Sequence, residues 1–155
     1  MIPCEPERRW RKGELTMFAA FPLMAFIVLI YDLVALSIGG MRSTSAQDQL
    51  AQPLFSIHMA SNAVWTVGLG DLLLTSALVL LFIELLKSTS SHRVAIVNHS
   101  LSMILFIVCL VEFLLFGACA TSTFFLITLM VLLDVLAGFI VTIVASRREV
   151  DLNSN

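Results

Sequence analysis

The stretch TFFLITLMVLLDVLAGFIVTIVA, from Thr123 to Ala145, decides the fold class of this chain. A membrane-spanning helix needs about 20 predominantly apolar residues to cross a hydrocarbon core of ~30 Å, and this stretch is long enough. Its single ionisable side chain, Asp134, lies near its middle. A carboxylate at that depth costs ~2.5–3.5 kcal/mol on insertion scales, so its presence requires a structural or functional reason.

Three more apolar stretches complete the pattern. We predict membrane-spanning helices at 16–38, 63–85, 96–116 and 123–145, all within one domain, 1–155. The chain is 59% hydrophobic and 13% charged, with a mean hydropathy of +0.97, which is typical of integral membrane proteins. The predicted fold class is therefore all-α: a polytopic membrane protein built as a four-transmembrane-helix bundle.

The positions of the basic residues predict the orientation. Eight of the nine lie before the first span, in the loop 86–95 or after the last span: Arg8, Arg9, Arg11, Lys12, Lys87, Arg93, Arg147 and Arg148. Only Arg42 lies in the loop 39–62. Because cytoplasmic loops carry the excess of Lys and Arg, we expect both termini and the loop 86–95 to be cytoplasmic. The loop 39–62 is then periplasmic, and the protein is expected in a bacterial inner (cytoplasmic) membrane.

The loop 39–62 has two parts of different character. Residues 41–52 are polar and expected to be flexible, whereas 53–59 (PLFSIHM) are apolar and expected against the membrane surface or over the mouth of the bundle. The short link 117–122 makes the third and fourth helices antiparallel neighbours. We expect Gly39–Gly40 to end the first helix. The expected N-terminal caps are Ser61 and Asn62 for the second helix, Asn98 or Ser100 for the third, and Thr121, Ser122 or Thr123 for the fourth.

Each predicted span carries one carboxylate in its interior and no Lys or Arg: Asp32, Asp71, Glu112 and Asp134. Consecutive spans run in opposite directions, and a helix rises 1.5 Å per residue. The four carboxylates are therefore predicted to form one layer in the outer half of the bilayer, with Asp134 close to the midplane. Small and hydroxylated residues share their helix faces, which predicts that the acids face the bundle interior. The supporting polar residues are Thr75, Ser102 and Thr123.

Two kinds of function explain such a layer. In the first, the protein is a non-enzymatic membrane protein whose carboxylates bind protons or cations, as a small oligomeric transporter or channel or within a translocating complex. In the alternative, it is a structural or accessory subunit of a larger membrane complex, and the acids only hydrogen-bond helices together. The expected partners are the lipid bilayer and either further copies of the chain or other membrane subunits. The sequence contains no basic patch that would indicate nucleic acid as a partner.

The other reactive side chains predict neither catalysis nor a cofactor. Glu84 is expected at the cytoplasmic end of the second span, in a surface pair with Lys87. His92 and His99 are expected near the cytoplasmic surface and His58 on the opposite side, which does not give the facing pair that haem or metal ligation requires. The three cysteines are expected to fill apolar space.

Three segments carry a resemblance to a known group of proteins: WTVGLGDLLL (65–74), CLVEF (109–113) and LLDVLAG (132–138). They resemble small four-helix inner-membrane proteins of proteobacteria, and the resemblance covers nearly the whole chain. It implies the four-helix fold and no particular activity. The small multidrug resistance transporters also have four spans and a membrane-embedded acid, in their first helix. This chain offers Asp32 there, but nothing around Asp32 matches the first helix of those transporters, so the similarity is one of architecture only.

Overall fold

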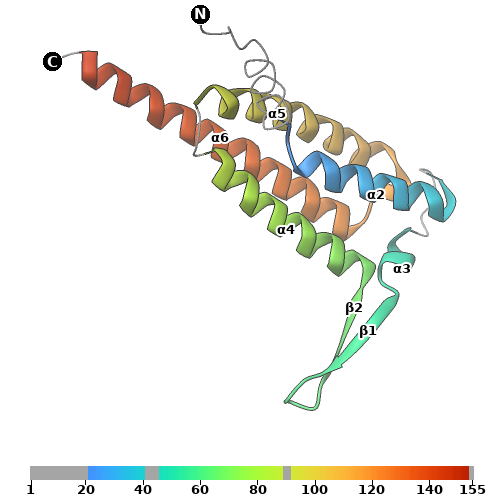
Figure 1. Ribbon diagram of the computed structural model, residues 1–155. Helices are drawn as coiled ribbons and strands as arrows, with labels where there is room; N and C mark the ends of the chain where they lie inside the picture. The colour runs from blue at the N-terminus through green and yellow to red at the C-terminus, as the bar shows by residue number, and fades with distance from the viewer. Residues whose placement is uncertain (1–20, 41–45, 89–91, 154–155) are drawn as a thin grey trace, which may run out of the picture.

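Long helices lying side by side dominate the computed structural model, which describes residues 21–40, 46–88 and 92–153 (Figure 1). Helix α6 packs against both α4 and α5, and α2 packs against α4. In Figure 1, α6 continues beyond the other helices toward the C-terminus. The long helices are α2 (Met24–Gly39), α4 (Leu69–Ser88), α5 (His92–Leu115) and α6 (Ser122–Asn153).

Three of these helices contain segments long and apolar enough to cross a membrane: Leu69–Lys87, Val97–Leu115 and Ser122–Ile140. Helix α2 is apolar but shorter in the described part, over Met24–Ile38, and residues 16–20 of the predicted first span lie outside the described residues. Only 28%, 22% and 39% of the three spans are buried inside the bundle. Most of their apolar side chains therefore face outward, as in a protein surrounded by lipid.

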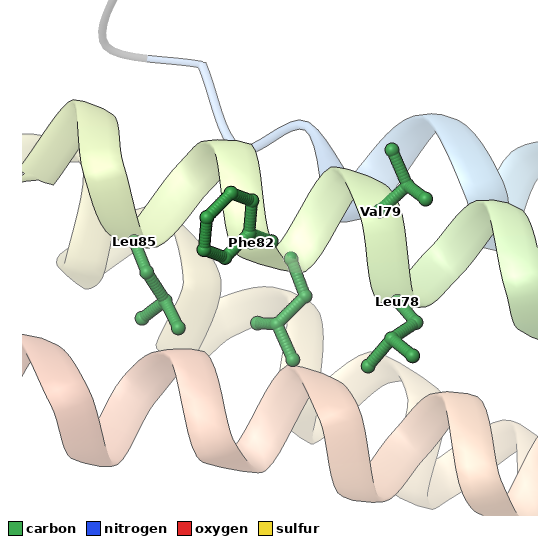
Figure 2. Close-up of a pocket in the computed structure, with 5 residues that line it drawn as sticks. Leu78, Val79, Phe82 and Leu85 are labelled. Atoms are coloured by element: carbon green, nitrogen blue, oxygen red, sulfur yellow. The ribbon is translucent and has the colours of Figure 1, made fainter.

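The outward face of α4 illustrates this surface. It carries a shallow groove of about 410 Å³ whose five lining residues are all apolar, and Figure 2 shows two of them, Leu78 and Leu85, extending toward α6. Hydrocarbon chains fit such a groove without leaving any polar group unsatisfied. The lining residues are Leu78, Val79, Leu81, Phe82 and Leu85.

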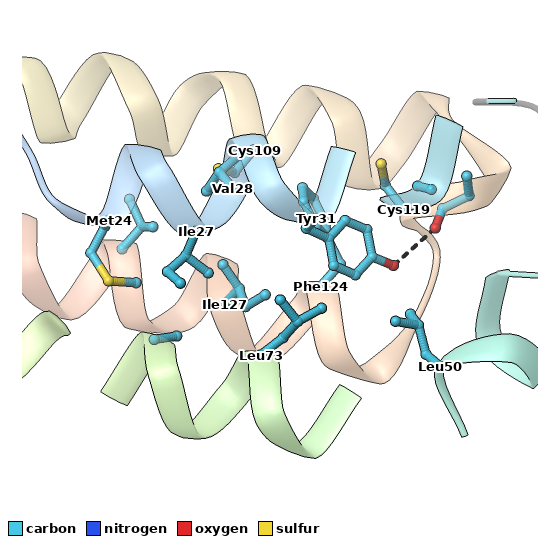
Figure 3. Close-up of a cluster of buried hydrophobic side chains, with 14 of the residues drawn as sticks. Met24, Ile27, Val28, Tyr31, Leu50, Leu73, Cys109, Cys119, Phe124 and Ile127 are labelled. Carbon is cyan, nitrogen blue, oxygen red and sulfur yellow. Dashed lines mark hydrogen bonds between the residues drawn. The ribbon is translucent and has the colours of Figure 1, made fainter. Parts of the chain in front are cut away.

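An aromatic contact joins α2 to the start of α6 in the core (Figure 3). The rings of Tyr31 and Phe124 lie 4.8 Å apart between centroids, and both side chains are buried. The Tyr31 hydroxyl donates to the carbonyl oxygen of Ala118 at 3.0 Å and lies 2.6 Å from the Thr121 hydroxyl. Thr121 Oγ1 in turn accepts the backbone N–H of Phe124, so the prediction of a cap among residues 121–123 is confirmed at Thr121.

Two short helices close the same end of the bundle. Helix α3 (Ala46–Leu50) buries Ala46 and Leu50, and it contacts α2, α4 and the 3₁₀ turn η1 (Gly117–Cys119). Residues 46–50 are therefore helical and packed, contrary to the flexible segment that we predicted from their polar composition. We call this end the hairpin end, after the β-hairpin described next, and the opposite end, where Lys87 lies, the Lys87 end.

An antiparallel hairpin precedes α4. Strand β1 (Pro53–His58) pairs with β2 (Val64–Gly68), so residues 63–68 are not part of the second span and the helix begins six residues later than predicted. Asn62, expected as a helix cap, instead lies in the turn with φ of 63°. The error has a physical cause, because Val64, Trp65, Thr66 and Val67 favour strands and continue the apolar run of α4. The all-α prediction consequently holds for the bundle only.

The remaining helix boundaries were predicted with mixed success. Gly40 ends α2 with φ of 83°, as expected of the Gly39–Gly40 pair, and its N–H donates to the Leu36 carbonyl. Helix α5 begins at His92, four residues before the predicted start, so neither Asn98 nor Ser100 caps it. The close packing of α5 and α6 confirms that the third and fourth predicted helices are neighbours.

We predict that Tyr31→Phe destabilises the bundle. The hydroxyl bonds to Ala118 and Thr121 inside a closed core, and its loss should lower the free energy of unfolding by about 1–3 kcal/mol. Denaturant unfolding in mild detergent measures this change. Ser37→Ala is the control, because the Ser37 hydroxyl is exposed and bonds only to Val34 on the same helix. Equal effects of the two substitutions would contradict the role given to Tyr31.

Candidate functional site

Five polar side chains from three helices meet inside the bundle near the Lys87 end, and we call them the polar cluster. All are less than 9% exposed, and Glu84, Ser102 and Asp134 are fully buried. Helix α4 contributes one member, α5 three and α6 one. The members are Glu84, Asn98, His99, Ser102 and Asp134.

Glu84 holds the first turn of α2. Its Oε1 accepts the backbone N–H of Leu23 at 3.1 Å, and its Oε2 accepts that of Met24 at 3.2 Å. The first N–H groups of a helix have no partner within the helix, and the partial positive charge of that end favours a carboxylate. Glu84 thus joins α4 to α2, which corrects the surface position that we predicted for it.

Asn98 and Lys87 complete the bonding around Glu84. The Asn98 Nδ2 donates to Glu84 Oε1 at 2.9 Å, and Lys87 Nζ donates to Asn98 Oδ1 at 3.5 Å. Lys87 Nζ also donates to the carbonyl oxygen of Phe21 at 3.0 Å. The carboxylate therefore has three donors, one of which is an amide oriented by a cation. Both oxygens of the buried Glu84 carboxylate are therefore hydrogen-bonded.

Asp134 is placed very differently. Neither of its carboxylate oxygens, nor either ring nitrogen of His99, has a hydrogen-bond partner among the described residues, although all four atoms are buried. The Ser102 hydroxyl lies close enough to Asp134 to interact with its carboxylate, although the geometry does not make a hydrogen bond, and His99, Lys87 and Glu84 lie within electrostatic reach. A buried carboxylate without a hydrogen bond is costly in its charged form, so a proton or cation at Asp134 lowers the energy of the folded protein.

Ser102 determines which bonds such a proton can make. The Ser102 hydroxyl donates its proton to the Asn98 carbonyl oxygen at 3.1 Å. Its oxygen remains free to accept a hydrogen bond from another donor. A protonated Asp134 can therefore donate either to Ser102 Oγ or to an imidazole nitrogen of His99. Ser102 was predicted as a supporting polar residue, whereas His99 was expected at the surface.

A glycine on α6 makes room for His99. A Cβ added at Gly138, one helical turn after Asp134, would overlap the imidazole ring. Side chains four residues apart share a helix face. The same face of α6 therefore leaves room for the imidazole ring at Gly138 and carries the carboxylate of Asp134 one turn away. The spacing Asp134–Gly138 in the sequence is a signal for this contact, but nothing in the sequence identifies His99 as the partner.

A second carboxyl pair lies nearer the hairpin end. Asp32 on α2 and Glu112 on α5 are half-buried and within electrostatic reach of each other. Each has one buried oxygen without a hydrogen-bond partner in the described ranges. Cys109 and Cys119 are buried and free nearby. Burial raises the pKa of the Cys119 thiol, which lies outside the spans, to about 12, so it carries no thiolate near neutral pH.

Asp71 stands apart from both groups. Its side chain is exposed in the first turn of α4, and its Oδ2 accepts the N–H of Gly68 at 2.9 Å. The residue at helix position N3 makes the same bond to the N-cap residue in a capping box. Thr75 donates to the Asp71 carbonyl oxygen and is also exposed, so these bonds are local. Thr123 is half-buried in the first turn of α6, close to Gly70 rather than to an acid of the cluster.

The predicted acids are consequently distributed along the bundle. Asp134 lies beside Glu84 near the start of α2, whereas Asp32 lies eight residues beyond Met24, about 12 Å along the same helix. Asp71 belongs to the hairpin end. Within the described residues, no three of the His, Cys, Asp and Glu side chains converge as a metal site requires.

We predict that the two buried acids contribute differently to stability. Glu84→Met keeps much of the volume but removes the acceptor of three hydrogen bonds, and should cost about 2–4 kcal/mol of unfolding free energy. Asp134→Asn keeps the shape of the side chain, and the amide can replace the contact of the carboxylate with Ser102, so it should change the unfolding free energy by less than about 1 kcal/mol. Thermal and denaturant unfolding of both variants in the same detergent tests this. A larger loss for Asp134→Asn would reverse the assignment.

No family model, curated protein or solved structure matches this chain.

Proposed function

We propose that this chain is a non-enzymatic, multi-pass membrane protein in which Asp134 and His99 bind and release a proton. One observation carries the proposal. The carboxylate of Asp134 and the imidazole of His99 are both buried, lie within electrostatic reach of each other, and have unpartnered polar atoms. Intramembrane acids with these properties mark proton and ion pathways more often than purely structural contacts.

The bound proton can take two positions in the pair, and its release leaves the Asp134 carboxylate beside a neutral His99. With the proton on the Asp134 carboxyl, the pair is neutral and the acid donates to His99 or Ser102. With the proton on His99, the pair becomes a carboxylate and an imidazolium. Glu84, held by three donors, lies beside Asp134.

The Asp32–Glu112 pair is a second station in this proposal. Ten residues of α5 separate Ser102 from Glu112, a rise of about 15 Å, which excludes a direct proton transfer between the two sites. A transporter or channel of this kind needs bound water or a conformational change between them. Self-association or a larger translocating complex would provide the additional wall, because four helices enclose little space.

The membrane placement is part of the same proposal. We retain four spans with both termini cytoplasmic in a bacterial inner membrane, since eight of nine basic residues then lie inside. Helix α2 rises about 24 Å over its 16 described residues, somewhat less than the ~30 Å hydrocarbon core. The Lys87 end then faces the cytoplasm and the hairpin end the periplasm.

One observation favours the alternative function, an accessory subunit whose acids only join helices. Glu84 does join α4 to α2, and Asp71 only caps its own helix. Hydrogen bonds within the protein explain the burial of Glu84 and the position of Asp71 without any ligand. Asp134 is what distinguishes the two functions, because no hydrogen bond in the described part of the chain explains it.

We predict that Asp134→Asn abolishes proton binding without preventing assembly. The amide keeps the shape and can both donate and accept, but it does not titrate. Infrared difference spectra between acid and alkaline pH should lose a protonated-carboxyl band, and reconstituted vesicles under a pH gradient should lose proton flux. Asp71→Asn is the matched control and should leave both signals unchanged. Unchanged bands and flux in Asp134→Asn would refute the site, and wild-type protein without either signal would favour the accessory subunit.

The orientation is tested separately. In a Cys4→Ser background, Ser45→Cys should react with an impermeant thiol reagent added to intact cells, and Ser90→Cys should react only after the membrane is opened. The two native cysteines that remain, Cys109 and Cys119, are buried and give a low background. Labelling of position 90 from outside would invert the topology.

A further inference from the structure

The hairpin has one apolar face and one mostly polar face. Cross-strand partners project to the same side, and successive residues of a strand project to opposite sides. Phe55 pairs with Val67 and Ile57 with Trp65, and these pairs share one face. On the other face, Ser56 pairs with Thr66 and His58 with Val64.

The apolar face is only partly covered by the residues that the structure describes. Phe55 is 48% exposed, Ile57 43% and Trp65 53%, and only Val67, at the base, is buried. A two-stranded hairpin by itself is marginally stable in water, so about half of each of these three side chains needs a further surface.

The surrounding sequence indicates what kind of surface that is. No Asp, Glu, Lys or Arg occurs between Asp48 and Asp71. Exposed edge strands in water are usually protected by charges, lysine above all, and this hairpin has none. Tryptophan with other apolar side chains beside polar ones is instead typical of the boundary between lipid and water.

The position of the hairpin also favours that boundary. Strand β2 ends at Gly68, and the membrane-spanning segment of α4 begins at the next residue, Leu69. Figure 1 shows the hairpin leaving the end of the bundle and projecting to one side of α4 rather than continuing along the helices. A ribbon in this position runs along the surface of a membrane that α4 crosses.

The junction between hairpin and helix is tightly packed. A Cβ at Gly68 would lie 2.8 Å from the Leu50 carbonyl oxygen, so only glycine fits where α3 meets the end of β2. Asp71 bonds the N–H of the same glycine. The direction of the hairpin is therefore fixed relative to α4.

We propose that the apolar face of the hairpin, formed by Phe55, Ile57 and Trp65, lies in the headgroup region of the lipid leaflet at the hairpin end. The opposite face, with Ser56, His58, Thr66 and the single apolar side chain of Val64 near the turn, faces water. The hairpin acts as an interfacial anchor that sets the depth and rotation of α4. This proposal is independent of proton binding at Asp134.

Two tryptophan variants of the full chain test the proposal. The chain has two tryptophans, so Trp10→Phe leaves Trp65 as the only one, on the apolar face. Trp10→Phe/Trp65→Phe/Thr66→Trp moves the fluorophore by one residue, to the opposite face. Each is reconstituted in vesicles of phosphatidylethanolamine and phosphatidylglycerol with acyl chains brominated close to the headgroup, and acrylamide is the aqueous quencher.

We expect the brominated lipid to quench Trp65 at least about twofold more than the tryptophan introduced by Thr66→Trp, and acrylamide to show the reverse order. Equal lipid quenching at both positions, or free access of acrylamide to Trp65, would overturn the proposal. Protection of Trp65 from both quenchers would overturn it as well, because a protein surface would then cover the face. The Trp10→Phe variant keeps the native hairpin, so its lipid and acrylamide quenching decide the result even if the Thr66→Trp chain does not fold.

Discussion

The carboxylate of Glu84 at the first turn of α2 is the interaction on which the rest of the bundle depends. Inside a membrane no water is available for the free N–H groups at a helix start, so a buried start needs an acceptor from the protein. Glu84 provides both oxygens to Leu23 and Met24 and positions α2 against α4. Its buried oxygens in turn require donors around them, which explains why Asn98 is buried and why Lys87 reaches back to Asn98 and Phe21. The helix that supplies Tyr31 to the core and Asp32 to the second pair is thus fixed at its base.

The same interaction gives Asp134 its chemistry. Glu84 and Asp134 lie close enough to repel each other when both are charged, and the donors that satisfy Glu84 do not bond Asp134 in the described part of the structure. In the proposed function, a proton held by Asp134 or shared with His99 relieves this repulsion. If the acids served only to join helices, each would be expected to show the bonding of Glu84. The contrast between two fully buried carboxylates a short distance apart is what favours a functional site over a structural one.

The parts of the structure that depend on local sequence were predictable, and the parts that depend on distant partners were not. Long apolar segments identified α5 and α6, and the short link 117–122 identified them as neighbours. Thr121 and Gly40 were identifiable as helix ends because each acts within a few residues. Strand β2 was missed because an apolar run before a span looks the same whether it is helical or extended, until its pairing with β1 is known. Glu84 was misjudged although it follows Leu73, Ala77 and Leu81 along one buried face; that spacing was a usable signal. The burial of His99 depends on a glycine that lies on another helix, and no periodicity reveals it.

The packing between Asp134 and the Asp32–Glu112 pair determines how the proposed proton site can be reached. Along α6, Val131, Ile127 and Phe124 lie on the same face as Asp134 toward the hairpin end, and all three are fully buried. Tyr31 packs on Phe124 and is bonded to Ala118 and Thr121, so this layer is apolar and closed by a hydrogen-bonded contact. In the opposite direction the polar cluster continues through Asn98 to the Lys87 ammonium group at the end of the bundle. In the proposed function a proton would reach Asp134 from the Lys87 end, and movement onward to Asp32 and Glu112 would have to pass the buried apolar side chains of Val131 and Ile127. The Tyr31–Phe124 contact lies at the level of the second pair, about ten residues along α6 from Asp134, and closes the core there. An apolar segment between the two proposed sites would prevent a continuous proton leak.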